Sequence, residues 1–268
     1  LNIQKKIDLV HLRGGYPGLI YFLSLCRNKY IYDIRAFWGQ WADGGRTKYN
    51  SITYKILLNL EKRLISKASG IVVLDNSGKK FLDKNYQIKI PLSVIPTSTD
   101  IYKFKLNTNF ESKQQINFVY LGGVNYPPYR VKDALLFINY LNKLGVVCQI
   151  DFINKNEHTI IERIIKKENL NKINYSIISL KHEQIFKVLP KYDVGLIFLE
   201  NGKWIKMSSP TKVGEYLAAG LKIIGNKNIA VLDRLAKESL CVETIKINGL
   251  ECSYSSTKIK NLLRRIKD

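Results

Sequence analysis

Short apolar runs alternate with amphipathic segments along the whole chain. Apolar runs of this length predict buried strands, and apolar residues at every third or fourth position predict helices. The strongest helical pattern lies in residues 48–68, where Ile52, Ile56, Leu60 and Leu64 recur at helical spacing. Predicted strands cover residues 7–12, 30–35, 70–75, 92–100, 116–123, 146–153, 173–180, 193–200 and 221–226. Predicted helices cover 17–29, 48–68, a segment from 76 onward, 131–145, 158–170, 182–192, a segment from 210 onward and a Lys/Arg-rich segment that closes the chain.

This alternation predicts an α/β fold with parallel sheets, because strand–helix–strand units form right-handed crossovers. Residues 101–115 are polar and weakly periodic, which is typical of a linker. We therefore expect two Rossmann-like domains, at 1–106 and 107–268, and the last helix of the second could return to the first. Ligands of such folds bind at the carboxyl ends of the strands. The loops to examine are 13–16, 36–45, 122–130 and 201–211.

In the stretch SSPTKVGEYLAAG, a cation lies where the start of a helix favours an anion. Ser209 and Pro210 are typical of a helix cap and first position. Lys212 then falls in the first turn, where a cation costs ~0.3–1 kcal/mol. A docked phosphate would remove this conflict, because backbone N–H groups, the ammonium and the Thr211 hydroxyl would all face it. Alternatively, Lys212 is solvated and paired with Glu215 three residues on.

Two other features of the second half could contact a nucleotide. Glu215 shares a helix face with Lys212, and its carboxylate could accept two hydrogen bonds from a ribose diol, worth roughly 1.5–3 kcal/mol each. Gly122 and Gly123 follow a predicted strand and would let a ligand approach the backbone closely, and Arg130 could reach a phosphate. A surface glutamate, a simple turn and a surface arginine are the alternative interpretations.

The loop after the second predicted strand combines charge, aromatic rings and glycine. Asp33 and Arg35 end that strand, and Trp38 and Trp41 follow within the stretch AFWGQWADGG. Aromatic residues in a loop at the ligand edge of a sheet favour a shaped pocket. The alternative is that Asp33 and Arg35 form a structural ion pair.

The formal net charge of +21 favours anionic partners. The basic residues are spread along the chain, without a basic stripe between aromatic residues, a zinc-finger spacing or an RNA-binding motif. A nucleic-acid-binding function would rest on the net charge alone, so no nucleic acid is expected as a partner.

The sequence contains no pattern of metal ligands. The four cysteines form no CxxC pair, the three histidines (His11, His158 and His182) are far apart, and no Asp-x-Asp motif occurs. We therefore expect no metal and no cofactor. Cys26 and Cys148 lie in apolar segments, as buried thiols do, and free thiols are typical of a reducing compartment. With no bilayer-length apolar run and no signal-peptide pattern, a cytoplasmic location is expected.

The stretch SSPTKVGEYLAAGLKIIGN resembles the donor-site signature of retaining glycosyltransferases of family 4, which have the two-domain GT-B fold. Four other stretches agree with that family in order. They are IDLVHLRGGYPGLI, YDIRAFWGQWADGG, LEKRLISKASGIVVLDNSGKKFL with VIPTSTD, and FVYLGG. The resemblance covers nearly the whole chain.

The resemblance implies a nucleoside-diphosphate-sugar donor and transfer of a hexose-like sugar with retention. Glu215 would bind the ribose hydroxyls, and Lys181 and His182 would border the base. Asp33 and Arg35 would line the donor sugar and, together with Lys212, take part in catalysis. The diphosphate would be held by Ser209, Pro210, Thr211 and Lys212, near Gly122, Gly123 and Arg130.

The chain departs from the family pattern in two places. Met207 stands where many members have a second glutamate, eight residues before Glu215. Members also usually carry a glycine-rich loop and further strand–helix units before the segment that matches IDLVHLRGG. The resemblance therefore implies an N-terminal domain that lacks its first strand–helix units and exposes apolar edges. The chain would then be a partial or degenerate copy of a longer enzyme.

By resemblance, the enzyme would help to build a bacterial surface polysaccharide. Its acceptor would be a glycan or a lipid-linked sugar, and the basic surface could contact the anionic cytoplasmic face of a membrane. The alternative function is a non-catalytic nucleotide-binding protein.

Overall fold

A computed structural model of the chain describes residues 7–24, 27–105, 114–125, 129–239, 241–248 and 251–252. The protein folds into two compact units. Unit 1 holds the described residues up to Thr97 together with Asn201–Ser209, and unit 2 holds Ser98–Glu200 and the described residues from Pro210 onward. The boundary expected at 106/107 and the expected C-terminal Lys/Arg-rich helix lie outside the described residues.

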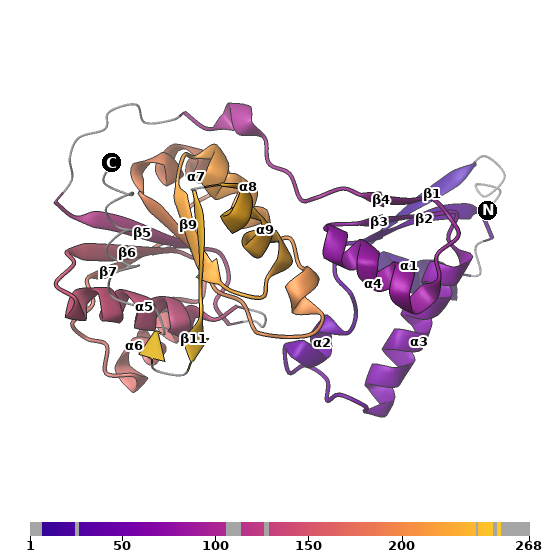
Figure 1. Cartoon of the computed structure of the whole chain (residues 1–268), viewed down its shortest axis with the longest axis horizontal. Helices are drawn as coiled ribbons and strands as arrows, with labels where there is room; N and C mark the ends of the chain where they lie inside the picture. The colour runs from indigo at the N-terminus through magenta and orange to yellow at the C-terminus, as the bar shows by residue number, and fades with distance from the viewer. Residues whose placement is uncertain are drawn as a thin grey trace. The chain divides into compact units, whose positions relative to one another are not determined.

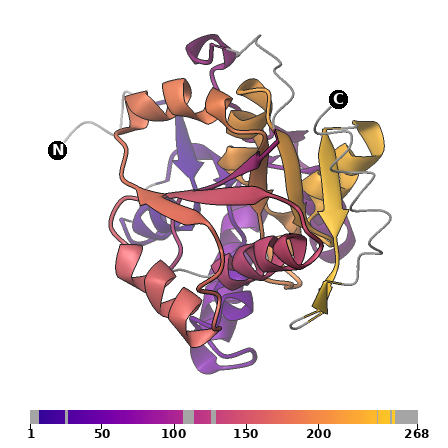
Figure 2. The same ribbon diagram turned by 90° about the vertical axis from the view of Figure 1, so that its left-hand side faces the viewer.

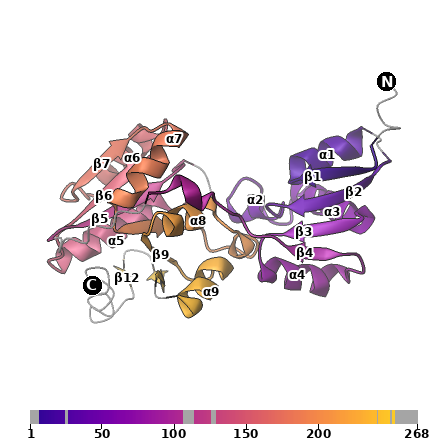
Figure 3. The same ribbon diagram turned by 90° about the horizontal axis from the view of Figure 1, so that it is seen from above.

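Unit 1 contains a sheet of four parallel strands in the order β1-β2-β3-β4 (Figure 3). Because each strand lies beside the one before it in sequence, right-handed crossovers place the connecting helices on one face of the sheet. Figure 1 shows α1, α3 and α4 on that side. The elements of the unit are β1 (Leu9–Arg13), α1 (Gly15–Leu23), β2 (Lys29–Ile34), α2 (Gln40–Asp43), α3 (Ile52–Lys67), β3 (Gly70–Val73), α4 (Asn76–Tyr86), β4 (Leu92–Val94) and the 3₁₀ helix η4 (Ile205–Met207).

Unit 2 contains a six-stranded parallel sheet in the order β10-β9-β8-β5-β6-β7, with helices on both faces (Figures 1 and 2). The strand order reverses between β5 and β8, which is where ligands bind in sheets of this kind. The elements are η2 (Ile101–Lys103), β5 (Ile116–Leu121), α5 (Val131–Lys143), β6 (Cys148–Ile153), α6 (His158–Lys167), β7 (Tyr175–Ile178), α7 (His182–Val188), η3 (Leu189–Lys191), β8 (Val194–Ile197), α8 (Thr211–Ala218), β9 (Lys222–Asn226), α9 (Ala230–Glu238), β10 (Val242–Ile245) and the hairpin β11 (Ile247–Asn248) and β12 (Glu251–Cys252).

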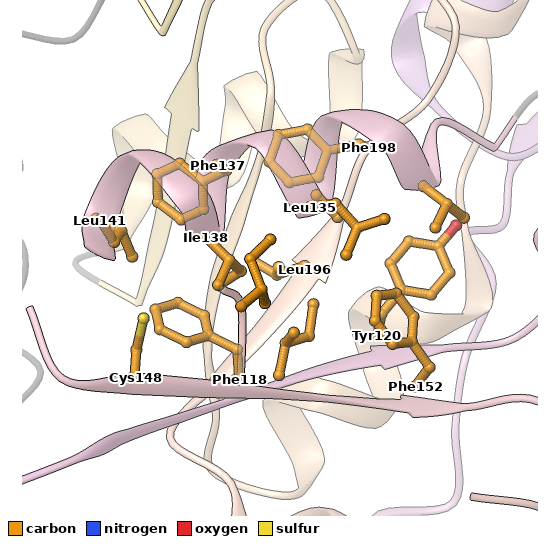
Figure 4. Packing of buried hydrophobic residues seen from close by; sticks show 14 of the residues in the cluster. Phe118, Tyr120, Leu135, Phe137, Ile138, Leu141, Cys148, Phe152, Leu196 and Phe198 are labelled. Carbon is orange, nitrogen blue, oxygen red and sulfur yellow. The ribbon is translucent and has the colours of Figure 1, made fainter. Parts of the chain in front are cut away.

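The core of unit 2 lies between the sheet and the helices that cover it. Figure 4 shows Leu135 and Ile138 of α5 against Phe118 and Phe152 of the sheet, and all four side chains are fully buried. These positions follow the predicted periodicity, with every second residue on a strand and every third or fourth on the helix. Cys148 is buried in the same core, as expected.

The predicted α/β class and the parallel sheets are confirmed, and most differences are at element ends. The strand expected over 92–100 ends at Val94. After Ile95 donates its amide to Val73, Pro96 has no N–H to continue the ladder. The helix expected over 182–192 changes to 3₁₀ geometry at Leu189, before Pro190. The sequence reading missed α2, α9 and β10.

Residues 201–209 leave unit 2 and complete the core of unit 1. The carboxylate of Asp43 accepts hydrogen bonds from the amides of Trp204 at 2.6 Å and Ile205 at 2.7 Å. The Trp204 ring packs on Phe37 and Phe81, with ring centroids 5.7 and 4.9 Å away. Only 3% of Trp204 is exposed, so a residue distant in sequence fills space that unit 1 would otherwise leave empty.

No helix in the described part of the chain combines the length and the apolarity that crossing a bilayer requires.

Glu61 of α3 is fully buried in unit 1. Its Oε1 accepts a hydrogen bond from the amide of Trp38 at 3.1 Å. Within the described part of the chain, neither its Oε2 nor the buried Tyr32 hydroxyl has a hydrogen-bond partner. Burial raises the pKa of Glu61 to about 8, against the opposing effect of the Trp38 hydrogen bond. The folded protein therefore keeps this carboxyl protonated to a higher pH than the unfolded chain does.

We expect Glu61→Gln to reduce the pH dependence of thermal stability. Below the ordinary glutamate pKa of 4.5 the contribution of the neutral carboxyl is fully present, and it is lost as the pH rises through about 8. Between these values the melting temperature of the wild type should fall several degrees more than that of the variant, measured by circular dichroism. Glu162→Gln, at an exposed position, should behave like the wild type. Equal slopes for wild type and Glu61→Gln would contradict this account.

Candidate functional site

Helix α8 begins one residue later than the sequence predicts. Pro210 is the N-cap residue, without a side-chain hydrogen bond to the helix, and Thr211 is the first helical residue. Ser209 is not the cap, because its hydroxyl accepts a hydrogen bond at 2.6 Å from Thr97 within unit 1. Among the described residues, no acceptor bonds the amides of Thr211 and Lys212. The first turn of α8 therefore has free N–H groups and no acidic residue.

Lys212 is buried, with 7% of the residue exposed. Its Nζ lies 4.7 Å from the ring centroid of Tyr120 and 4.2 Å from that of Tyr129. No carboxylate in the described part of the chain lies within ion-pair distance of this Nζ, and no hydrogen bond reaches it. The interpretation of Lys212 as a solvated lysine paired with Glu215 is therefore wrong.

The electrostatics of Lys212 follow from this burial. Loss of water lowers the pKa of Lys212 to about 7, and the negative charge of Glu215 acts in the opposite direction. The faces of two aromatic rings attract the cation, but they supply less than an anion would. A bound anion would therefore stabilise the charged form of the Lys212 amine.

The glycine loop after β5 contacts Lys212 directly. Gly122 has a positive φ of 110°, and a Cβ built on it would lie 3.2 Å from both Cε and Nζ of Lys212. A side chain here would be strained and would crowd the amine. One residue earlier, the amide of Leu121 donates to the hydroxyl of Tyr216 at 2.9 Å, which ties the end of β5 to α8.

Asn154 and Glu157 hold the same loop from the next strand. Asn154 donates to the carbonyl of Gly122 at 2.9 Å and to Glu157 at 2.9 Å. Glu157 in turn accepts from the amides of Val124 at 2.7 Å and Asn125 at 3.4 Å. The sequence reading missed both residues. The sequence pattern that could have identified them is an Asn-x-x-Glu spacing at the end of a predicted strand.

Glu215 and His182 belong to the same region of unit 2. Glu215 is half-buried, and burial raises the pKa of its carboxyl, while nearby His182 and Lys212 lower it. His182 is the first residue of α7, and its ring lies edge-on to Phe186 at 4.8 Å. Lys181, the N-cap of α7, donates its amide to Gln184 at 2.8 Å. The half-buried carboxylate near a histidine suits recognition of a polar ligand.

Arg130 is the N-cap residue of α5, and its guanidinium already forms ion pairs. Its Nε lies 2.8 Å from Asp133 and 3.9 Å from Glu200. Burial raises the pKa of Asp133 to about 6, and Arg130 acts in the opposite direction. A phosphate contact by Arg130 would therefore compete with this ion pair.

The remaining predicted site residues lie in unit 1. Asp33 is 5% exposed and lies one residue before the end of β2, with His11 Nε2 at 3.4 Å and Arg35 Nη1 at 3.7 Å from its carboxylate. Its Oδ1 has no hydrogen-bond partner among the described residues. The predicted Asp–Arg pair thus exists, and His11 joins it. Among the predicted site residues, unit 2 contains Lys212, Glu215, His182, Gly122 and Gly123. Unit 1 contains Asp33, Arg35 and Ser209.

Across the described residues, no group of three or more His, Cys, Asp or Glu side chains could hold a metal ion.

The chain is similar in structure to several glycosyltransferases at low sequence identity. Sucrose-phosphate synthase from Thermosynechococcus elongatus matches with a TM-score of 0.67 and 12% identity, over 97% of this chain and 64% of that one. Anabaena HepE, in complex with UDP and glucose, matches with a TM-score of 0.59 and 11% identity over 84% and 61% of the two chains. An E. coli structure titled trehalose-6-phosphate, bound with UDP-2-fluoro glucose, matches with a TM-score of 0.59 and 12% identity over 86% and 61%.

These likenesses identify the fold as GT-B, with two Rossmann-like domains. The chain spans less than two thirds of the length of each of these structures. No protein-family model matches the chain, and no curated protein matches it in sequence.

We expect Asn154→Ala to loosen the glycine loop. The change removes the hydrogen bonds that the Asn154 side chain donates to Gly122 and Glu157. Because Asn154 is only 4% exposed, water cannot replace these bonds, and unit 2 should lose about 1–3 kcal/mol of stability. Hydrogen exchange measured by mass spectrometry should become faster over residues 122–125. Asn174→Ala, at an exposed position, is the matched control and should leave this exchange unchanged. Wild-type exchange in Asn154→Ala would show that the loop does not depend on this side chain.

Proposed function

We propose that the protein is a glycosyltransferase that moves a sugar from a nucleoside-diphosphate-sugar to an acceptor hydroxyl. The buried amine of Lys212 carries this proposal, since it lies at an uncapped helix N-terminus beside a glycine loop and has no ionic partner among the described residues. Two phosphates supply the negative charge that this arrangement lacks. The GT-B likeness supports the same class of donor.

The proposed reaction breaks the bond between the anomeric carbon and the diphosphate oxygen and forms a bond to the acceptor oxygen, which loses its proton. Negative charge then builds up on the departing diphosphate. Lys212 and the free amides of α8 would stabilise this charge without a metal ion. Arg130 would assist by exchanging Asp133 for phosphate.

The other site residues receive roles from their chemistry and from the family resemblance. The carboxylate of Glu215 would accept hydrogen bonds from the ribose hydroxyls, and His182 with Lys181 would border the base. Asp33 and Arg35 of unit 1 would line the donor sugar. We further propose retention at the anomeric carbon and a cytoplasmic role in building a surface polysaccharide, with a glycan or lipid-linked acceptor.

The first test is a thermal-shift panel of UDP, GDP, ADP and CMP with their sugars. We expect one nucleotide to raise the melting temperature of the wild type by several degrees and Glu215→Ala to lose most of that shift. Glu238→Ala, exposed and paired with Arg234 at 2.8 Å, is the control and should keep the shift. A wild-type shift in Glu215→Ala would remove Glu215 from the site.

Turnover of the donor that binds separates an enzyme from a nucleotide-binding protein. Release of free nucleotide in the presence of an acceptor should persist in EDTA, because the proposed charge stabilisation uses Lys212 and backbone amides. Binding without turnover would favour the non-catalytic function, and full loss of activity in EDTA would overturn the metal-free mechanism.

The affinity for the nucleotide-sugar should fall as the pH rises above about 7. Above the lowered pKa of Lys212 the free amine is largely neutral and must take up a proton when the diphosphate binds. Calorimetric titrations should show affinity decreasing by up to about tenfold per pH unit, with proton uptake from the buffer. Lys212→Arg should show little pH dependence, since arginine stays protonated. A pH-independent wild-type affinity would contradict the neutral-amine account.

A further inference from the structure

Two tyrosine rings lie against the buried amine of Lys212, and neither ring has a role in the reaction proposed above. The Nζ atom is 4.2 Å from the ring centroid of Tyr129 and 4.7 Å from that of Tyr120. At such distances the face of an aromatic ring attracts an ammonium ion, and the attraction grows when water is excluded. Because only 7% of Lys212 is exposed, hydration competes little with the rings.

The position of the Tyr129 ring is set by its backbone. Tyr129 forms an antiparallel bridge with Leu199, and the amide of Arg130 donates to the carbonyl of Phe198 at 3.0 Å. The ring lies beside the glycine loop, since a Cβ built on Gly123 would be 3.9 Å from its Cε2. Burial raises the pKa of the Tyr129 hydroxyl, so the ring stays neutral. Main-chain pairing with the segment after β8 therefore presents a neutral ring to the amine.

The other titratable groups around Lys212 come from three helices of unit 2. Burial lowers the pKa of Lys212 to about 7, and Glu215 on the same helix acts in the opposite direction. His182 of α7 lowers the pKa of Glu215. Glu157, the N-cap residue of α6, raises the pKa of Tyr120. Glu215 and the two ring faces are thus the groups that favour the charged amine.

We propose that Tyr129 is a positioning residue for the donor diphosphate and acts through Lys212. The face of its ring favours the charged amine before the donor binds, so less free energy is needed to protonate Lys212 on binding. This inference rests on the proposed function, since it concerns how the same amine receives its ligand. It assigns the effect to the ring and not to the hydroxyl, so phenylalanine should replace Tyr129 and leucine should not.

Tyr129 is the ring to change, because Tyr120 is 1% exposed and belongs to the core of unit 2 (Figure 4). The alternative role for Tyr129 is to block the space beside the glycine loop. A blocking ring would have to move when a phosphate binds, and its removal would tighten binding. The cation–π distance of 4.2 Å favours the positioning role, because this contact stabilises the charge that the phosphate needs.

The first test uses no nucleotide, so it is independent of the proposed function. In protein labelled with ¹³C at lysine Cε, NMR follows the charge of each amine during a pH titration, and the Lys212 signal is the one missing from Lys212→Arg. Loss of the ring face favours the neutral amine. The midpoint for Lys212 in Tyr129→Leu should therefore lie about one pH unit below that of the wild type.

Two further variants show whether the ring face causes this effect. Tyr129→Phe keeps the ring and should titrate like the wild type. Tyr175→Leu removes another partly buried tyrosine, on the edge strand β7, and is the matched control that should also titrate like the wild type.

The second test measures affinity for the nucleotide-sugar by calorimetry at about pH 8 and about pH 5.5. At the higher pH, Tyr129→Leu should bind about tenfold more weakly than the wild type, because more of its Lys212 must be protonated on binding. At the lower pH the two proteins should bind almost equally. A ring with a merely structural role would weaken binding by the same factor at both pH values.

The outcomes separate this inference from the proposed function. Equal Lys212 midpoints in the wild type and Tyr129→Leu would overturn the inference, and so would a pH-independent loss of affinity. Tighter binding by Tyr129→Leu would show that the ring blocks the site. A wild type that binds no nucleotide would overturn the proposed function, and a shifted midpoint would then support only the action of Tyr129 on the amine.

Discussion

The candidate site depends on one buried ammonium group that has no counter-ion among the described residues. Lys212 occupies the first turn of α8, where both the helix dipole and the loss of water oppose a positive charge. The faces of Tyr120 and Tyr129 and the negative charge of Glu215 favour the cation, and the absence of a side chain at Gly122 leaves space for it. An arrangement that is unfavourable alone and favourable with an anion is typical of a binding site.

The fold fixes the positions of the residues that surround the Lys212 amine. The reversal of strand order places β5 beside β8, so the loop after β5 and the start of α8 meet at one edge of the sheet. Tyr216 then joins the two elements by accepting the Leu121 amide, and Asn154 with Glu157 supports the loop from β6. The residues of the candidate site are thus held by hydrogen bonds to neighbouring strands and helices, and not by their own loop alone.

The sequence predicts local features better than distant ones. Alternating apolar patterns predict the parallel α/β fold, because periodicity depends on neighbouring residues. The conflict at Lys212 is also local, so a short stretch of sequence is enough to predict a candidate site there. By contrast, the burial of Lys212, the support from Asn154 and the attachment of Ser209 to Thr97 depend on residues brought together by folding. No short-range pattern contains that information.

The return of residues 201–209 to unit 1 has a consequence for synthesis on the ribosome. Trp204 and Met207 belong to the core of unit 1, and Asp43 binds the amides of Trp204 and Ile205. The nascent chain up to Thr97 therefore emerges with a vacancy in its core that only a much later segment fills. Domains usually fold in order as they leave the ribosome, but here the core of unit 1 can be completed only after most of unit 2 has been translated. Holdase chaperones would have their longest opportunity to act during that interval.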